Sequence, residues 1–183
     1  MKRCVVSSIL ISIFLCSCSL KYSEGYNVED SVPEFSFSDT SFTRYENKEK
    51  KLLMTASKLE QYKDGYSMYG KDVSFTVMED NEVATEGFCS YLGLNSKAEI
   101  YELFDNISIT NKKQNMKVTG KKFKWNGKTE QLISGRNDTV MIEKDGMTIH
   151  GSGFSASGVS NSFAFTSIVT GTLETKDDEA SNE

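Results

Sequence analysis

Few side chains in this 183-residue sequence could take part in chemistry, and those few are scattered. The chain has four cysteines and one histidine, His150, and three of the thiols (Cys4, Cys16 and Cys18) lie close to the N-terminus. Cys89 is therefore the one thiol left for the body of the chain, and a single thiol forms neither an internal disulfide nor a zinc site. No triad, clustered carboxylates or phosphate loop accompanies it. The sequence predicts a non-enzymatic protein without cofactor or metal, with His150 exposed and Cys89 buried as a small apolar side chain.

The N-terminal cysteines point to a different chemistry, the attachment of lipid. Two basic residues precede an apolar stretch, residues 5–15, that is short for a membrane span. It ends in Leu15-Cys16-Ser17-Cys18, which resembles a bacterial lipobox with Leu at −3 and small residues before the acylated cysteine. Cys16 is the poorer acceptor, because Phe14 and Leu15 would then occupy the small positions. We expect a signal peptide over 1–17 and palmitate on Cys18; an ordinary secretory signal and an uncleaved anchor are the alternatives.

The rest of the chain divides into a tether, one domain and a tail. Residues 18–38 are polar, contain the single proline and are expected to form a tether behind the lipidated cysteine. Residues 39–175 suffice for one domain, and 176–183 form an acidic tail predicted to be disordered. Removal of Lys2 and Arg3 with the signal changes the formal net charge from −5 to −7, which argues against nucleic acid as a partner.

The elements of the domain are predicted to be short β-strands. Apolar residues alternate with Ser, Thr, Lys and Glu in many places, the pattern of a strand with one buried face. Four segments of similar internal order begin at Thr55, Thr85, Val118 and Ile149, which indicates a repeat of about thirty residues. Asn126-Gly127 and Asp145-Gly146 are the strongest hairpin turns. Two stretches, 48–62 and 98–105, admit a helix, but their flanks favour strands, so the expected fold is all-β.

One stretch resembles a known family. "KFKWNGKTEQLISGRNDTVMIEKDGMTIHGSGFSAS" is similar to the C-terminal half of LptC, of the LptC/LptA (OstA-like) periplasmic lipopolysaccharide-transport proteins. Trp125-Asn126, Val140-Met141-Ile142 and Ile149-His150-Gly151-Ser152-Gly153-Phe154 fill the places of its motifs. The resemblance spans roughly residues 40–173. It implies a twisted open β-jelly roll of two antiparallel sheets. Family members usually keep an N-terminal membrane helix, whereas a lipid anchor is expected here.

The resemblance implies a function in lipid transfer. The domain would receive lipopolysaccharide or a related glycolipid, extracted from the inner membrane by an ABC transporter complex, and pass it to an LptA-like periplasmic protein. Its location would be the periplasmic face of the inner membrane. The alternative is an outer-membrane envelope lipoprotein that binds a protein or glycan through the same sandwich. The identity of the glycolipid, and an LptA-like rather than LptC-like role, stay open at this point.

The residues expected to line a lipid groove are the inward members of the alternating strands; taken singly, each is also an ordinary core residue. They are Met68, Phe75, Val77, Ile107, Ile109, Val118, Phe123, Trp125, Val140, Ile142, Ile149, Phe163 and Phe165. Six lysines between Lys112 and Lys124 are read either as a solvated strand face or as a basic rim for lipid phosphates.

The last strand is expected to bind a partner. The segment 162–175 contains Phe163, Phe165, Ile168 and Val169, with no proline and no charge before Glu174. Natural edge strands are usually protected by lysine, proline or a bulge, so we expect a smooth edge to accept a strand of another chain. Photo-crosslinkers at Thr166 and Thr170 test this expectation. The alternative is a central strand paired on both sides.

Overall fold

The computed structural model describes residues 32–159, 162–167 and 169–173, and within them it contains strands and no helix. The all-β prediction is confirmed, including over 48–62 and 98–105. Twelve strands follow one another: β1 Phe35–Glu46, β2 Glu49–Gln61, β3 Ser67–Glu79, β4 Glu82–Asn95, β5 Ile100–Asn111, β6 Met116–Asn126, β7 Gln131–Ser134, β8 Thr139–Lys144, β9 Met147–Ser152, β10 Phe154–Ser157, β11 Ser162–Phe165 and β12 Thr170–Leu173.

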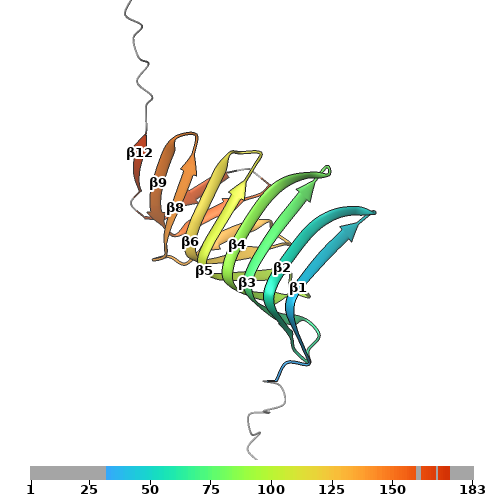
Figure 1. Ribbon diagram of the computed structural model, residues 1–183. Helices are drawn as coiled ribbons and strands as arrows, with labels where there is room; N and C mark the ends of the chain where they lie inside the picture. The colour runs from blue at the N-terminus through green and yellow to red at the C-terminus, as the bar shows by residue number, and fades with distance from the viewer. Residues whose placement is uncertain (1–31, 160–161, 168, 174–183) are drawn as a thin grey trace, which may run out of the picture. The chain divides into compact units, whose positions relative to one another are not determined.

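The strands form one continuous antiparallel sheet in which β1 to β6 are long and lie side by side in chain order (Figure 1). At β6 the sheet divides. The first part of β6, Met116–Thr119, pairs with β8, and the second part, Phe123–Asn126, pairs with β7. Beyond this point β8, β9 and β12 continue one branch, and β7, β10 and β11 continue the other. The two expected sheets are therefore two branches of a single open sheet.

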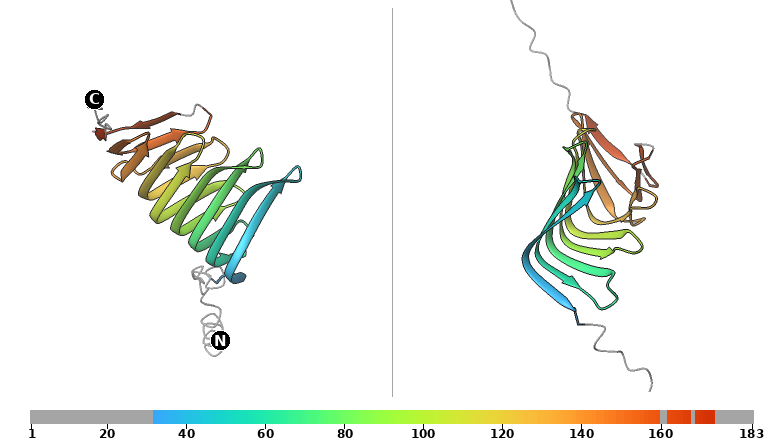
Figure 2. Two further views of the ribbon diagram at one scale, coloured as in Figure 1. Left: turned by 45° about the horizontal axis from the view of Figure 1, so that its top comes forward. Right: turned by 90° about the vertical axis from the view of Figure 1, so that its right-hand side faces the viewer.

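Each long strand bends in its middle, and the bends line up across the sheet (Figure 2). At the bend a few residues are missing from the pairing ladder: Asp39, Ser57, Asp72, Ser90, Asp105, Asn106 and Lys121. Four of them have positive φ, between 47° and 54°: Asp39, Asp72, Asp105 and Asn106. Asp and Asn tolerate this conformation better than other non-glycine residues. The strand halves before and after the bend form two walls.

Wall A is the branch that contains β7, β10, β11 and the first half of β1. Wall B is the branch that contains β8, β9, β12 and the second half of β1. Polar side chains join neighbouring strands along the bend between them. Ser57 Oγ donates to Asp72 Oδ2 at 2.9 Å, and Asn106 Nδ2 donates to Ser90 Oγ at 2.9 Å. These side-chain bonds connect strands where backbone pairing is interrupted.

The turns along the free edge of wall A show the thirty-residue repeat directly. Ser96 N–H donates to the carbonyl of Tyr66 at 3.0 Å, Gly127 N–H to that of Glu99 at 2.8 Å, and Gly158 N–H to that of Glu130 at 2.8 Å. Each turn is thus bonded to the turn about thirty residues earlier. On wall B the predicted Asp145-Gly146 hairpin is present, with φ of 50° and 79°, the positive values that a two-residue turn of this kind needs.

Three strand boundaries differ from expectation. Strand β3 joins what look like two short strands in the sequence, because Asp72 bends the chain without reversing it. Strand β1 begins at Phe35, before the domain boundary expected at residue 39, since Phe35 and Phe37 alternate with serines in register with β2. The segment 162–175 is not one strand: β11 pairs with β10 and β12 pairs with β9, one on each wall.

Candidate functional site

The candidate site is the face of the sheet that carries the buried side chains, here called the inner face. Directly opposed residues of antiparallel strands lie on the same face, so the pairing register assigns every strand position to one face. All thirteen residues predicted to line a groove lie on the inner face. Ile107, Val118, Phe123, Val140 and Ile142 are buried, Phe163 is exposed, and the other seven are half-buried.

The core draws on both walls. Its buried members are Met54, Ala56, Leu59, Val73, Cys89, Leu92, Leu103, Ile107, Val118, Phe123, Val140, Ile142 and Phe154. No polar or charged side chain of the described residues is buried. An interior of this composition solvates apolar groups and offers no hydrogen bonds, which suits aliphatic chains rather than a polar ligand.

Burial on the inner face changes along the sheet. Phe123 and Ile142, on the central strands, are 0 % exposed. At the β1 edge, inner residues Phe35, Phe37 and Phe42 are 50 %, 47 % and 44 % exposed. These three were not among the predicted site residues, although the alternation of Phe35 and Phe37 with serine signals an apolar face. The apolar inner face therefore extends to the β1 edge and is accessible there.

Inner-face glycines make room for aromatic rings next to the bend. A Cβ on Gly87 would overlap the ring of Phe75, its cross-strand partner. A Cβ on Gly120 would lie 2.8 Å from Cζ of Phe123, and one on Gly151 would lie 2.6 Å from Cδ1 of Phe165. Such distances are far below van der Waals contact, so any side chain at these positions would displace a ring that fills the core.

We expect Gly87→Ala to lower the free energy of unfolding by about 1–3 kcal/mol, the usual cost of overpacking a core. The ring of Phe75, which packs against the core, must move to make room for the added methyl group. Urea unfolding followed by Trp125 fluorescence measures the effect. Gly93→Ala, on the outer face of the same strand, is the control, because its Cβ would meet Tyr69 at an ordinary 3.7 Å. Equal stability of the two variants would contradict the packing argument.

Four phenylalanines gather where the sheet ends on wall A. The ring of Phe154 lies 5.9 Å from that of Phe123, 5.5 Å from that of Phe165 and 6.3 Å from that of Phe163. Such edge-to-face and tilted contacts add about 0.5–1.5 kcal/mol per pair beyond area burial. The cluster holds the short strands β10 and β11 onto the core.

Cys89 is buried in the core, as expected. Burial raises the pKa of its thiol to about 12, because an apolar environment disfavours the thiolate. The thiol is therefore protonated and unreactive in the folded domain. His150 lies on the outer face of β9 and is exposed. No group of three or more His, Cys, Asp or Glu side chains in the described ranges could hold a metal ion.

Of the six lysines between Lys112 and Lys124, four have a carboxylate partner, as in a solvated strand surface. Lys112 contacts Glu86 at 2.7 Å, Lys113 pairs with Glu79, and Lys117 and Lys124 lie 3.4 and 3.8 Å from Glu143 and Glu102, respectively. The side-chain hydrogen bond to Glu79 raises the pKa of Lys113. Lys122 lies over the ring of Phe104, and Lys121 is at the bend.

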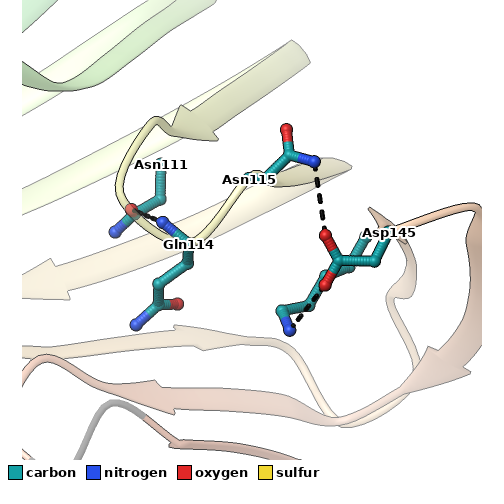
Figure 3. A network of polar contacts seen from close by, with 5 residues as sticks. Asn111, Gln114, Asn115 and Asp145 are labelled. Carbon is teal, nitrogen blue, oxygen red and sulfur yellow. Dashed lines mark hydrogen bonds and ion pairs between the residues drawn. The ribbon is translucent and has the colours of Figure 1, made fainter.

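A shallow, open depression of about 430 Å³ occurs on wall B beside the β5–β6 and β8–β9 turns. Figure 3 shows the polar contacts there: Asn115 Nδ2 donates to Asp145 Oδ1 at 3.3 Å, and Lys144 Nζ donates to Asp145 Oδ2 at 3.0 Å. The hydrogen bond from Lys144 is the main reason that the pKa of Asp145 is lowered. The charged groups that line the depression pair with one another. The contact between Asn115 and Asp145 connects the two turns.

The sheet has three edges. Among the described residues, strand β1 pairs with β2 alone, β11 with β10 alone and β12 with β9 alone. Phe163 and Phe165, predicted for a partner edge, are on β11, whereas Val169 precedes β12 and Ile168 lies outside the described residues. Thr170 is on the outer face of β12, and Thr166 lies between the strands, where its N–H contacts the carbonyls of Ser152 and Gly153.

Comparison with known proteins gives one result. A family model described as "Lipopolysaccharide-assembly, LptC-related" matches residues 8–174. No curated protein matches the chain. In the part of the chain that the structure describes, no helix has the length and apolar character needed to cross a membrane.

Proposed function

This chain belongs to the LptC-related family of lipopolysaccharide-assembly proteins, and we propose from this premise that its inner face holds the acyl chains of lipopolysaccharide or a related glycolipid in transit. The family makes the protein a component of lipopolysaccharide transport in the periplasmic envelope. In the proposed cycle, an inner-membrane ABC transporter complex supplies the lipid and the energy, and an LptA-like protein receives the lipid.

The observation that supports this proposal is the apolar inner face that runs from Phe42 on β1 to Phe163 on β11 without a buried polar group among the described residues. Transfer of acyl chains from water to such a surface gains about 0.8 kcal/mol per buried methylene. Lipid would enter where inner residues are exposed, at β1. Where side chains already fill the core, the two walls would separate to admit an acyl chain.

Photo-crosslinking in cells tests the proposal with a matched pair on one strand. Phe42 points to the inner face and neighbouring Ser41 to the outer face, and both are exposed. A photo-reactive phenylalanine at position 42 is expected to capture lipopolysaccharide, detected as a shifted band with antibody to the glycolipid. The same group at position 41 is not. Capture at both positions, or at neither in an exported protein, contradicts the proposal.

We further propose that the two C-terminal edges, β11 on wall A and β12 on wall B, add strands of the LptA-like partner, which would continue the inner face into the next protein. A photo-crosslinker at Thr170 is expected to capture that second protein, because no strand of the described residues pairs with the far side of β12. Ser74, exposed on the outer face of the central strand β3, is the control. Crosslinks from Thr170 that remain within its own chain would rule this edge out as the contact.

The proposed anchor is palmitate on Cys18 at the periplasmic face of the inner membrane. A tether between the acylated residue and β1 would keep the domain near the transporter. The test of this anchor is described in the Discussion.

A further inference from the structure

The outer faces of the two walls differ in composition. On wall A, two cross-strand rows run over β1 to β6; they contain Lys58, Lys71, Tyr91, Phe104 and Lys122 in one row and Glu60, Tyr69, Gly93, Glu102 and Lys124 in the next. On wall B the corresponding rows are mainly serine and threonine, among them Ser41, Thr55, Ser74, Ser108, Thr119, Thr76, Thr110 and Thr148. The aromatic–lysine face, defined as Lys58, Tyr69, Lys71, Tyr91, Phe104 and Lys122, thus belongs to wall A alone.

Two of the three aromatic rings of this face are exposed to solvent, and the third is half-buried. Tyr69 is 54 % and Tyr91 is 50 % exposed. Tyr62 packs against Tyr69 with ring centroids 5.4 Å apart in a T-shaped contact. Lys122 Nζ lies 5.3 Å from the centroid of Phe104. Tyrosine next to lysine is the combination that proteins use at the boundary between water and lipid headgroups, where the ring is partly desolvated and the polar end stays wet.

The charge of this face is opposite to that of the chain. The two rows on wall A contain four lysines and two glutamates, whereas those on wall B contain one lysine, Lys117, and two glutamates, Glu86 and Glu143. Glu60 pairs with Lys58, and Glu102 lies 3.8 Å from Lys124. Within the described residues, no ion pair engages Lys71 or Lys122. A positive surface on a chain of formal net charge −5 favours an anionic partner.

The chain enters the domain on the same wall as this face. The N–H of Glu34 donates to the carbonyl of Gln61, so the chain enters wall A beside Tyr62 and the β2–β3 turn. Residues 19–31, between the proposed lipidated cysteine and the domain, span at most about 45 Å even when fully extended. The aromatic–lysine face therefore lies on the wall at which the tether from the proposed anchor would join the domain.

We propose that the aromatic–lysine face of wall A docks reversibly on the surface of an anionic phospholipid bilayer, with Tyr69 and Tyr91 at headgroup depth and Lys71 and Lys122 against lipid phosphates. The proposal rests on the proposed lipid anchor. Docking would place the domain flat beside the membrane from which lipid is extracted, with wall B facing the aqueous space.

The test uses the acylated chain in liposomes of phosphatidylethanolamine and phosphatidylglycerol. A fluorophore is attached to Ser36→Cys, on the outer face of wall A, or to Ser74→Cys, on the outer face of wall B. Both serines are exposed, and Cys89 is buried with a raised thiol pKa, so it does not take the label. Headgroup spin-labelled lipid is expected to quench the probe at position 36 more strongly than that at 74.

Two sets of variants decide what causes the quenching. Tyr69→Ser combined with Tyr91→Ser, and Lys71→Gln combined with Lys122→Gln, are each expected to reduce quenching at position 36 to the level at 74. Phe88→Ser, at an exposed aromatic on the outer face of wall B, is the matched control and leaves the difference intact. Salt at about 1 M, where the Debye length is about 3 Å, is expected to weaken docking.

The possible failures are distinguishable. An acylated chain in which both probes are quenched equally overturns docking but leaves the anchor and lipid transfer standing. Unchanged quenching in liposomes of phosphatidylcholine alone overturns the role of the lysines. Crosslinking of the face to a protein, with no quenching at position 36, identifies a protein partner and overturns membrane docking. A chain without any acyl group refutes the anchor and the docking proposal together.

Discussion

Replacing Phe123 by alanine is expected to lower the free energy of unfolding by about 3–5 kcal/mol, the range for deletion of a buried phenylalanine ring. The ring is 0 % exposed, meets Phe154 edge to face with centroids 5.9 Å apart, and covers Gly120. It is on β6, where the sheet divides into its two branches. Its loss leaves a cavity at β6, the strand with which the first strands of both branches, β7 and β8, are paired. Urea unfolding at constant pH measures the effect.

Phe88→Ala is the control for this experiment. Phe88 is 36 % exposed on the outer face of wall B, so the same change of residue there removes less buried area than at Phe123. We expect a loss well below that of Phe123→Ala. If both variants lose similar stability, the inner face is not the principal core. If Phe123→Ala unfolds in two steps, the two branches unfold separately.

Cys18→Ser is expected to abolish palmitate labelling and to release the exported domain from membranes. Stable attachment requires more than one acyl chain, and the sequence of residues 19–38 lacks the apolar spacing of an amphipathic helix that could replace them. Contact of the aromatic–lysine face with lipid alone would not survive a high-salt wash. The measurement is metabolic labelling with palmitate, followed by fractionation of washed membranes. The soluble domain should unfold at the same urea concentration as the anchored one.

Cys16→Ser is the matched control for the anchor. Cys16 stands two residues before Cys18, so its replacement leaves Leu15 and the proposed acceptor in place and should preserve the label. Palmitate that persists in Cys18→Ser and disappears in Cys16→Ser would show that the acceptor has been assigned to the wrong cysteine. Loss of label in both would point to a requirement for Cys16 during processing.

Much of the fold follows from the period-two alternation of the sequence. The pattern that gives Val73, Phe75 and Val77 one face and Ser74 and Thr76 the other depends only on strand geometry. All thirteen predicted inner residues consequently lie on one face of the sheet. The Asp145-Gly146 turn was equally predictable, because few other dipeptides accept positive φ at both positions.

The bends could not be predicted, because they use residues that normally signal turns. Asp72 has φ of 49° and Asp105 has φ of 54°, values typical of a chain reversal. In the sheet these residues redirect a strand that continues for several more residues. Local sequence does not distinguish a turn from a bend of this kind, since the difference lies in the neighbouring strands, which bend at the same level. The predicted strands were therefore too short and too numerous along β3.

Burial within the inner face also depends on distant parts of the chain. Phe37 and Phe123 have the same side chain and the same alternating surroundings, yet one is 47 % and the other 0 % exposed. Phe37 is on an edge strand and Phe123 is next to the C-terminal branches. For the same reason the accessible residues of the candidate site, at β1, were not among those singled out from the sequence.

The hydrogen bonds that connect each turn of wall A to the turn about thirty residues earlier have a consequence for the protein's cooperativity. Gly127 N–H donates to the carbonyl of Glu99 and Gly158 N–H to that of Glu130, so each of these bonds joins a unit to its immediate neighbour in the repeat. Stability in such an array is approximately a sum of nearest-neighbour terms. Local unfolding can therefore start at an end of the array and stop at any interface between two units. A unit could also be gained or lost in evolution while the remaining interfaces between units are kept.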